Sequence, residues 1–520
     1  MTTTLSRSAP QAGAQPENSS AARAALAAGK PALVWRKLIA DSETPISAAR
    51  KLIVPERGDF LLESVQGGEV RGRYSLLGLD PDLVFRATGP KAEINPVWQT
   101  DREAFVPREG DSLVELRALV ERCRIDVPEG LPPTLACLVG YFGYETIGLV
   151  ETLPRAPQSP LVLPDMLFVR PTVVLVFDRL SDELTAVAPV WADGPCADDT
   201  DPQMLIDAAA ERIDAALARL HGPAPADPRL PEAIELAREP QMAPGLYAQI
   251  VSRAKDYITA GDIFQVVLAQ RFTAPFPLPP IALYRALRRI NPSPFLFFLD
   301  MPGFALTGSS PEILVRIRDG EVTIRPIAGT RPRGATSQED RANEESLLAD
   351  PKERAEHLML LDLGRNDVGR VAAAGTVKVT ESYTIERYSH VMHIVSNVVG
   401  KLDTARADSV DALFAGFPAG TVSGAPKVRA CQIIAELEPE TRGAYAGGVG
   451  YFAPDGSVDS CIVLRTAVVK DGIMHVQAGA GIVADSDPDA EQRECEHKSG
   501  ALFAAAREAI RVAAEPQFGQ

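Results

Sequence analysis

The alternation of apolar and polar residues predicts strands through residues 31–190. Two apolar segments, Asp59–Val65 and Arg73–Leu79, are joined across Gln66, Gly67 and Gly68, a connection typical of a β-hairpin. Three further β-branched segments are interrupted at Pro171 and Asp182: Leu167–Val169, Thr172–Phe177 and Leu184–Val190. These segments and a helix expected over residues 201–220 define a strand-rich N-terminal region, residues 31–220.

A helical period replaces the strand pattern after residue 200. One apolar stripe runs along residues 201–220: Leu205, Ile206, Ala209, Ile213, Ala216 and Leu217. Six prolines in residues 221–244 then predict a linker. Beyond it, a helix from Tyr247 stops at Gly261 and a strand follows over Ile263–Phe272. Helices and strands continue to alternate, which predicts an α+β fold with a second large region at 245–512 and a short tail at 513–520.

Composition narrows the class of protein. A chain of 520 residues is too long for one ordinary core, and its net charge of −16 without a basic stripe argues against a nucleic-acid partner. No apolar run approaches the ~18 residues of a membrane span. Six scattered cysteines without a C-x-x-C pair fit a reducing cytosol, so we expect a cytoplasmic protein without a zinc site. Residues 1–30 lack the apolar stretch of a secretory signal; a transit peptide is an alternative, and a disordered tail is favoured.

Two Glu-x-x-Glu pairs, Glu353 with Glu356 and Glu491 with Glu494, are the most informative polar pattern. Residues three apart share one helix face. Neighbouring carboxylates raise each other's pKa, and Mg²⁺ relieves this repulsion by binding one or two of them together with water and substrate oxygens. In a chain with 69 acidic residues the spacing also arises by chance, so a solvated helix face remains the alternative for either pair.

The residues around the first pair predict where its helix begins. Asp350 is the expected N-cap, Pro351 the first helical residue and Glu353 the partner of Asp350 in a capping box. Capping therefore explains Glu353 without a metal, but it does not explain Glu356. We expect Glu356 at the wall of a cleft, because four leucines that follow it are expected to cover the buried side: Leu358, Leu360, Leu361 and Leu363.

The second pair follows a glycine-rich segment. A strand is expected to end at Val476–Ala478, after which Gly479 and Gly481 would let the backbone approach a ligand with exposed N–H groups. A tight turn is the alternative for this segment. Lys498 lies four residues after Glu494 and can form a surface pair with it.

Three other segments suggest anion binding. Residues 325–334 combine glycines with Arg331 and Arg333. Residues 417–427 place glycines and hydroxyl side chains before a helix that begins near Pro426, whose N-terminus favours negative charge. Arg465 stands alone in an apolar strand and is expected to pair with a carboxylate of the protein or of a ligand.

Two histidines, His390 and His393, lie in a segment that reads as extended. Residues three apart on a strand face opposite sides, which argues against a shared metal site and leaves one histidine as an acid or base. From the residues alone, the chain is expected to hold a small polyanion with Mg²⁺, arginine and backbone N–H groups.

Nine strings between residues 245 and 510 together resemble the chorismate-utilising enzymes, and among these most closely the large subunits (component I) of anthranilate synthases. They are GDIFQVVLAQRF, GSSPE, PIAGTRPRG, EHLMLLDLGRNDVGRV, YSHVMHIVS, FPAGTVSGAPKVRA, YAGGVGYF, CIVLRTA and GAGIVADSDP, in the order of that family. The resemblance implies a large two-part fold with stacked antiparallel sheets and flanking helices.

The resemblance also implies the site residues. Glu356 and Glu494 would be the chief ligands of Mg²⁺, with Glu353 and Glu491 supporting them through water. The metal would bind the ring carboxylate of chorismate. The rest of the substrate would be held by Gly329, Thr330, Thr421, Tyr445, Arg465, Gly479, Ala480, Gly481 and Lys498.

Two catalytic roles follow from the same resemblance. Glu312 would be the general acid that helps the C4 hydroxyl leave, which requires a raised pKa. His393 matches the histidine associated with the elimination of pyruvate.

Two positions separate the reactions of this family. Aminodeoxychorismate synthases typically carry a nucleophilic lysine where this chain has Ala328, and isochorismate- or salicylate-forming relatives carry a water-activating lysine where it has Gln265. Both differences favour a Mg²⁺-dependent lyase that converts chorismate and ammonia to anthranilate and pyruvate, the first committed step of tryptophan biosynthesis. The alternatives are those two enzyme classes and an inactive tryptophan-sensing subunit.

Partners are implied as well. No cysteine lies in the G-x-C-x-G setting of a glutaminase nucleophile, so we expect a separate glutamine amidotransferase subunit (component II) in a hetero-oligomer. Leu61–Ser64 and Asn291–Phe298 resemble tryptophan-binding elements. Feedback inhibition by tryptophan is therefore expected at Ser64, Pro294, Phe295 and Leu296, although an ordinary strand and core loop would also explain these residues.

Overall fold

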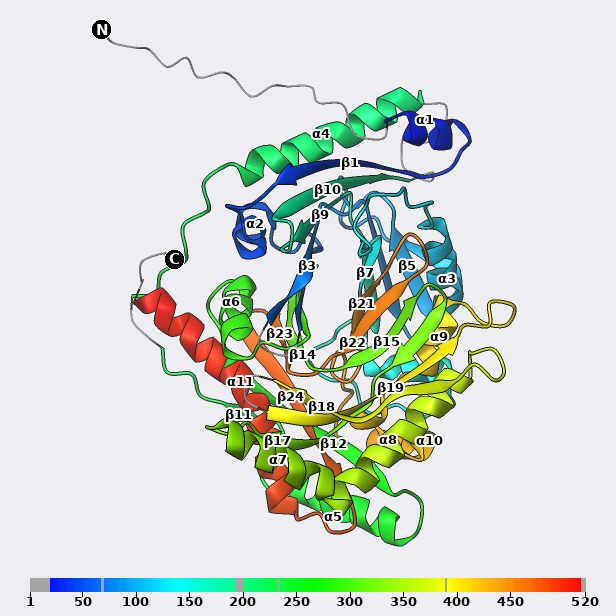
Figure 1. The fold of residues 1–520 in the computed structure, drawn as a ribbon. Helices are drawn as coiled ribbons and strands as arrows, with labels where there is room; N and C mark the ends of the chain where they lie inside the picture. The colour runs from blue at the N-terminus through cyan, green and yellow to red at the C-terminus, as the bar shows by residue number, and fades with distance from the viewer. Residues whose placement is uncertain (1–18, 67–69, 192–200, 232–233, 389–390, 516–520) are drawn as a thin grey trace.

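The computed structural model describes residues 19–66, 70–191, 201–231, 234–388 and 391–515, which form two large antiparallel sheets with helices around them (Figure 1). The first sheet has the order β1 (Ala32–Ile39), β10 (Glu183–Val190), β9 (Val173–Asp178), β3 (Val70–Leu79), β2 (Asp59–Gln66), β13 (Phe295–Met301), β14 (Phe304–Ser310), β23 (Thr466–Lys470), β24 (Ile473–Ile482), β12 (Gln265–Pro275) and β11 (Glu239–Pro240); β20 (Gly424–Ala425) also pairs with β12.

The second sheet is built in the same way from both parts of the chain. Its order is β17 (Ile327–Pro332), β19 (Val391–Lys401), β16 (Glu321–Ile324), β15 (Ile313–Arg318), β22 (Val458–Ile462), β21 (Gly448–Phe452), β7 (Leu138–Phe142), β8 (Met166–Arg170), β4 (Leu83–Thr88), β5 (Lys91–Asn95) and β6 (Val106–Asp111); β18 (Lys378–Arg387) pairs with β19.

The strands of residues 31–220 and of residues 245–512 hydrogen-bond to one another in both sheets. In the first sheet β2 pairs with β13, placing Ser64 opposite Phe295. In the second sheet β7 pairs with β21, placing Gly140 opposite Gly450. The proline-rich residues 221–244 thus separate the two regions along the chain, while backbone pairing joins them in space.

The local predictions for the N-terminal region are confirmed. β2 and β3 form an antiparallel pair on either side of the predicted hairpin connection. The interruption at Pro171 separates β8 in the second sheet from β9 in the first, so the chain changes sheets there. The predicted helix of residues 201–220 is α4 (Pro202–Leu220).

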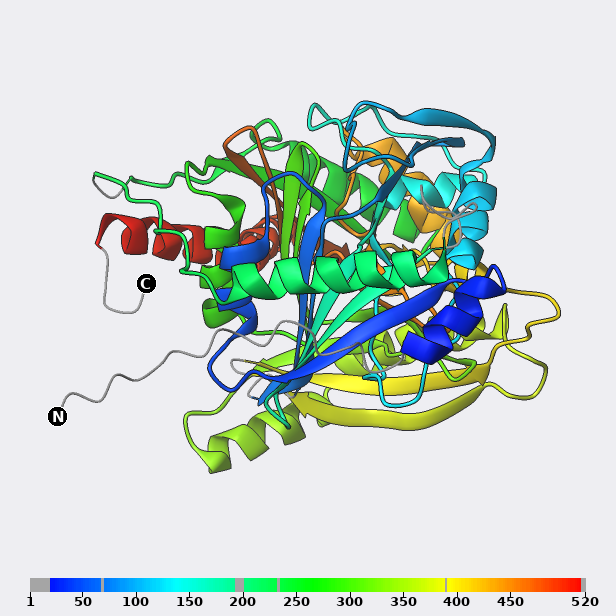
Figure 2. The same ribbon diagram turned by 90° about the horizontal axis from the view of Figure 1, so that it is seen from above.

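Helices cover the outer sides of the sheets. α4 packs on β1 and β10 with α1 (Ser19–Ala27) and α2 (Pro45–Leu52) beside it, and Figure 2 shows it stretched over these N-terminal strands. α6 (Pro280–Ile290) packs against α11 (Pro488–Ala514), and α11 also contacts β24 and α5 (Leu246–Thr259). The remaining helices are α3 (Ser112–Arg122), α7 (Ser337–Ala349), α8 (Pro351–Gly369), α9 (Ser409–Ala415), α10 (Lys427–Leu437) and the short 3-10 turns η1 (Tyr144–Leu149) and η2 (Gly420–Val422).

The main core lies between the two sheets. It includes Phe60 and Phe297 of the first sheet and Phe85 and Tyr141 of the second, all essentially inaccessible to solvent. β12 is buried on both faces from Gln265 to Ala274, its polar residues Gln270 and Arg271 included. The first residue of this strand, Gln265, lies in the candidate site.

Two global expectations can be compared with the structure. Of the helices within the described ranges, none is long and apolar enough to cross a membrane. The five cysteines that the structure describes, Cys123, Cys137, Cys431, Cys461 and Cys495, are buried free thiols. The sixth, Cys196, lies outside the described residues.

Candidate active site

α8 carries the first acidic pair, and its start differs in one respect from the prediction. Asp350 caps the helix, accepting from the backbone N–H groups of Lys352 and Glu353 at 2.9 and 3.4 Å. The second hydrogen bond of the predicted capping box, from the Asp350 backbone N–H to the Glu353 carboxylate, is wrong. That carboxylate instead accepts from Arg331 Nη1 at 3.1 Å. A charged donor held nearby is a stronger partner for a carboxylate than a backbone amide.

The four leucines after Glu356 were all expected on the buried side of α8, but only some of them are buried. Leu360 and Leu361 are buried, whereas Leu358 is 57% exposed, so its predicted place on the buried side is wrong. Successive helix positions are turned by about 100°, so residues 358, 360, 361 and 363 cannot all share one face. Gly364 and Val368 continue the buried side instead.

Glu356 lies in a mostly buried position beside Gln265. Burial raises the pKa of its carboxyl and the charge of Glu353 adds to this, while the hydrogen bond from Gln265 Nε2 to Glu356 Oε1, 3.2 Å long, lowers it. A carboxylate with a raised pKa gains most from a bound cation.

The second pair lies at the start of α11, which is capped by Asp487. Burial and the charge of Glu494 raise the pKa of Glu491. Glu494 pairs with Lys498 Nζ at 2.6 Å, and both side chains are about half exposed. Lys498 Nζ also donates to the Gly479 carbonyl at 3.0 Å, so this lysine ties α11 to β24 as well as forming the expected surface pair.

Charges on each acidic helix act on the carboxyls of the other. Lys498 of α11 lowers the pKa of Glu356 on α8, and Lys352 of α8 lowers that of Glu491 on α11. In the portion of the chain that is described, no three or more His, Cys, Asp or Glu side chains converge as a ready-made metal centre. The donors that the two pairs offer are carboxylate oxygens, the ligand type that a hard cation such as Mg²⁺ prefers.

Gln265 begins β12 and is paired with Ala425 of β20. Its Nε2 packs so closely on Gly481 that a Cβ there would lie 2.5 Å away, which explains the glycine. Its Oε1 is buried and has no hydrogen-bond partner among the described residues. An unsatisfied buried acceptor is costly, so one that faces a ligand site indicates an interaction with the ligand.

The glycine-rich segment is part of a strand, and the prediction that the strand ends at Ala478 is wrong. β24 continues to Ile482, and Gly479, Ala480 and Gly481 pair with Ala269, Leu268 and Val267 of β12. The glycines serve close packing, because a Cβ at Gly479 would lie 2.9 Å from both the Tyr445 hydroxyl and the Leu268 carbonyl. β23 pairs with β24 only as far as Val476, which leaves this stretch paired to β12 alone.

Glu312 lies between β14 and β15 and is 7% exposed. Thr421 of η2 donates to its Oε2 at 3.0 Å. Burial raises the pKa of Glu312 to about 8, against the opposing effect of this hydrogen bond. At neutral pH the carboxyl therefore keeps its proton, as a general acid must.

His393 and the residues of β17 form the opposite side of the site. A bulge between Ala328 and Thr330 places Gly329 at φ +68°. His393 Nδ1 lies 2.9 Å from the Gly329 carbonyl and 3.1 Å from Thr330 Oγ1. Burial lowers the pKa of His393 to about 4, so the ring is neutral. Since the carbonyl only accepts, Nδ1 carries the proton and Nε2 is left as the basic nitrogen. His390 lies outside the described residues.

The arginines divide into two kinds. Arg331 pairs with Asp350 and Glu353, and Arg333 pairs with Asp340, so these two are engaged within the protein. Arg465 is partly buried, its pKa is lowered by desolvation, and no carboxylate of the described residues contacts it. It lies close enough to His393 to lower that residue's pKa. The sequence allowed two partners for Arg465, a carboxylate of the protein or one of a ligand. Because no protein carboxylate of the described residues contacts it, the carboxylate of a ligand remains.

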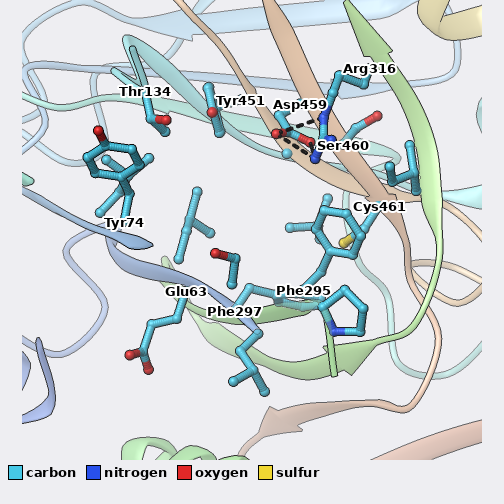
Figure 3. Close-up of a pocket in the computed structure, with 18 of the residues that line it drawn as sticks. Glu63, Tyr74, Thr134, Phe295, Phe297, Arg316, Tyr451, Asp459, Ser460 and Cys461 are labelled. Carbon is cyan, nitrogen blue, oxygen red and sulfur yellow. Dashed lines mark hydrogen bonds and ion pairs between the residues drawn. The ribbon is translucent and has the colours of Figure 1, made fainter. Parts of the chain in front are cut away.

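A cavity of about 610 Å³ lies between the two sheets. Ser64, Pro294, Phe295 and Leu296 line it, as do Pro311 and Ile313 on either side of Glu312. Figure 3 shows side chains from both sheets around it, with Glu63 and Phe297 on one side and Tyr451 and Asp459 on the other. Sequence reasoning missed Tyr451 and Asp459. Both lie in or beside conspicuous strings, but only the antiparallel pairing of β21 and β22 brings them to this wall.

Comparison with known proteins agrees with the geometry. The profile of the chorismate binding enzyme family matches residues 60–504. The anthranilate synthase component 1 of Cereibacter sphaeroides is 54% identical over 483 residues, covering 93% of this chain and 96% of that protein. That of Thermus thermophilus is 46% identical, covering 91% and 97%.

Solved structures resemble the fold as well. Anthranilate synthase component I from Streptococcus pneumoniae superposes with a TM-score of 0.73 at 34% identity, covering 83% of this chain and 92% of that one. The isochorismate synthase MenF from Escherichia coli has a TM-score of 0.66 at 20% identity, covering 92% and 95%, a likeness of fold alone.

Proposed function

The chain belongs to the family of chorismate binding enzymes, and from this premise we propose that it is the anthranilate-forming large subunit, a lyase that adds ammonia to chorismate and releases anthranilate and pyruvate. This would be the first committed step of tryptophan biosynthesis. The named relatives at 42–54% identity support the proposal.

The observation that carries the proposal is the amide of Gln265. Its Nε2 is fixed by Glu356, while its buried Oε1 has no partner in the described chain. Ammonia is a small donor that can satisfy this oxygen, and a neutral amide does not activate water as a lysine would. Ala328, buried where aminodeoxychorismate synthases carry lysine, supplies no amine nucleophile.

Two residues supply the proton transfers. As ammonia forms the new bond at C2, the C4–O bond breaks, and the protonated Glu312 gives its proton to the departing hydroxyl, which leaves as water. The ammonium group formed at C2 gives up one proton, which offsets the one that Glu312 donated. In the second stage the ring proton at C2 is removed and the C3–O bond breaks, and the departing enolpyruvate takes up a proton at its methylene carbon to become pyruvate. The neutral His393, with Nε2 unprotonated, would accept the C2 proton in this stage.

The substrate's carboxylates need positive partners in a chain of net charge −16. Arg465, without an internal carboxylate among the described residues, would bind one of them. Bound Mg²⁺, held by Glu356 and Glu494 with Glu353 and Glu491 behind them, would neutralise the ring carboxylate and orient the ring. The backbone of Gly479–Gly481 and the hydroxyls of Thr330, Thr421 and Tyr445 would shape the remaining walls.

The ammonia source and the regulation belong to the same proposal. The relatives are named component 1, which supports a second component, and we propose that this is a glutamine amidotransferase in a hetero-oligomer with this chain in the cytoplasm. The cavity at Ser64 and Phe295 would bind tryptophan as a feedback inhibitor, since it combines an apolar wall with a hydroxyl and has ample volume for an indole.

An ammonium-dependent assay tests the proposal. The isolated chain with chorismate, Mg²⁺ and ammonium is expected to form fluorescent anthranilate. Gln265→Leu is expected to raise the KM for ammonium about tenfold, the loss of one hydrogen bond. Gln270→Leu is the matched control, because Gln270 lies on the same strand but bonds to Gln492. Turnover without any nitrogen source would contradict the proposal and indicate an isochorismate or salicylate synthase.

A further inference from the structure

A buried ion pair between Glu438 and Arg442 lies directly behind the candidate active site. Arg442 Nε and Nη2 donate to the two carboxylate oxygens of Glu438 at 2.9 and 2.6 Å. The two side chains are 5% and 2% exposed. Removing two charges from water is costly, and a packed apolar pair is often at least as stable. Stability alone is therefore a poor explanation for this pair.

The guanidinium of Arg442 is used almost entirely within the protein. Nη1 donates to the Val422 carbonyl and Nη2 to the Val267 carbonyl, both at 2.7 Å. With the two bonds to Glu438, four of its five N–H donors are engaged. Arg442 is thus unlike Arg465 and is not available to bind a substrate.

Each backbone group that hydrogen-bonds to the side chain of Glu438 or Arg442 lies within two residues of, or is paired with, a residue of the candidate site. Val422 follows Thr421, whose hydroxyl donates to Glu312. Val267 is two residues from Gln265 and is paired with Gly481. Glu438 Oε1 also accepts from the Ala269 amide at 2.8 Å, and Ala269 is the partner of Gly479.

The same arginine also fixes a third segment. The Arg442 backbone N–H donates to Glu145 Oε1 at 2.7 Å, and the guanidinium lies 4.5 Å from the ring centre of Tyr144 and 5.7 Å from that of Tyr445. Tyr445 contacts Gly479 in the substrate wall. One ion pair therefore connects η2, β12 and the loop that carries Tyr445.

We propose that Glu438 and Arg442 are positioning residues: their ion pair holds Thr421 against Glu312 and holds β12 with Gln265 in register, without contacting chorismate. The inference rests on the proposed function of the site. Only a planar fork can bind a carboxylate with two parallel bonds and reach two carbonyls at once, so lysine cannot replace the arginine.

The test compares Arg442→Lys with the wild-type chain in the ammonium-dependent assay, at a temperature where circular dichroism shows both to be folded. We expect kcat to fall about 10²-fold, the cost of a displacement of about 1 Å at the reacting groups. The KM for chorismate should change less than kcat, because the arginine does not touch substrate.

The pH profile gives a readout that a merely structural role would not move. The hydrogen bond from Thr421 lowers the pKa of Glu312, and the charge of Glu312 in turn raises the pKa of Tyr388. Loosening Thr421 should therefore move the alkaline limb of kcat to higher pH. Thr421→Val should produce the same shift, and combining it with Arg442→Lys should add little further.

The matched control is Arg170→Lys. Arg170 forms a buried bidentate pair with Asp82 at 2.9 Å on β8, away from the site, and this variant should retain the wild-type kcat and pH profile once folded. If Arg442→Lys does not fold, kcat and the pH profile are measured instead on the double variant Glu438→Leu with Arg442→Met. This variant removes both charges and keeps the side-chain volume.

The outcomes separate this inference from the proposed function. A folded variant at Arg442 with low kcat and a shifted alkaline limb supports the inference. Wild-type kcat and pH profile in the folded variant overturn it and leave the proposed function intact. A wild-type chain that makes no anthranilate from chorismate and ammonium overturns the proposed function itself.

Discussion

The candidate active site and the cavity at Ser64 differ in how their polar and charged groups are paired within the protein. In the active site, Gln265 Oε1 has no hydrogen-bond partner and Arg465 has no carboxylate partner among the described residues, and burial raises the pKa of Glu356. The charged residues that line the cavity are instead paired. Arg316 binds Asp459 at 3.1 Å, and Glu63 binds Arg288 at 2.8 Å.

This difference indicates two kinds of recognition. Unsatisfied charge is stabilised by a polar ligand, and it lets the site respond to charge that develops during a reaction. A cavity whose charged walls are already neutralised selects by shape and by a few hydrogen bonds. Substitutions that change charge should therefore act mainly on the first region, and substitutions that change volume mainly on the second.

The largest expected effect is that of Glu494→Ala. Losing this carboxylate removes one helix's contribution to Mg²⁺, so turnover should fall to the level that the wild-type chain shows with a chelator. Binding of tryptophan, measured by calorimetry, should persist because Glu494 does not line the cavity. Activity at the wild-type rate would contradict the assignment of the metal ligands.

Glu312→Gln should come next, with kcat lowered by 10²–10⁴-fold, the usual contribution of a positioned acid. Chorismate should still bind. The wild-type kcat should decline as pH rises through about 8, because the pKa of Glu312 is raised and the acid loses its proton there. If the variant keeps this alkaline decline, another group is the acid.

Ser64→Arg should have the smallest effect of the three on the reaction and a specific effect on inhibition. A long side chain at the cavity wall would compete with the inhibitor for volume. Each variant is compared with its own uninhibited rate, and the tryptophan concentration for half inhibition should rise by about tenfold or more, as for the loss of 1.4 kcal/mol or more of binding energy. Unchanged sensitivity would place the inhibitor elsewhere.

Much of the local structure could be predicted from the sequence. The hairpin of β2 and β3, the helix α4 and the cap at Asp350 depend on neighbours in the chain, which the sequence displays directly. The clustering of Glu353 and Glu356 followed from helix geometry, although the partner of Glu353, Arg331, lies 22 residues away and required the fold.

Non-local pairing could not be predicted in the same way. The family resemblance assigned Ser64 and Phe295 to one site, but the residues around Ser64 do not show that the two are paired, because that register joins two strands more than 200 residues apart. Gly479 and Gly481 were expected to follow the end of a strand and to expose N–H groups, with a tight turn as the alternative, but both lie within β24, where they pack against Tyr445 and Gln265. Glu438 and Arg442 gave no signal, since their role depends on carbonyls that only the assembled site presents.

The central claim is that this site attaches ammonia to C2 of chorismate and then aromatises the ring. Incubating the isolated chain with chorismate, Mg²⁺ and ¹⁵N-ammonium, and identifying the product by NMR, tests it most directly. The account predicts ¹⁵N-labelled 2-aminobenzoate together with one equivalent of pyruvate. A labelled 4-amino-4-deoxychorismate, or an unlabelled isochorismate, would contradict it.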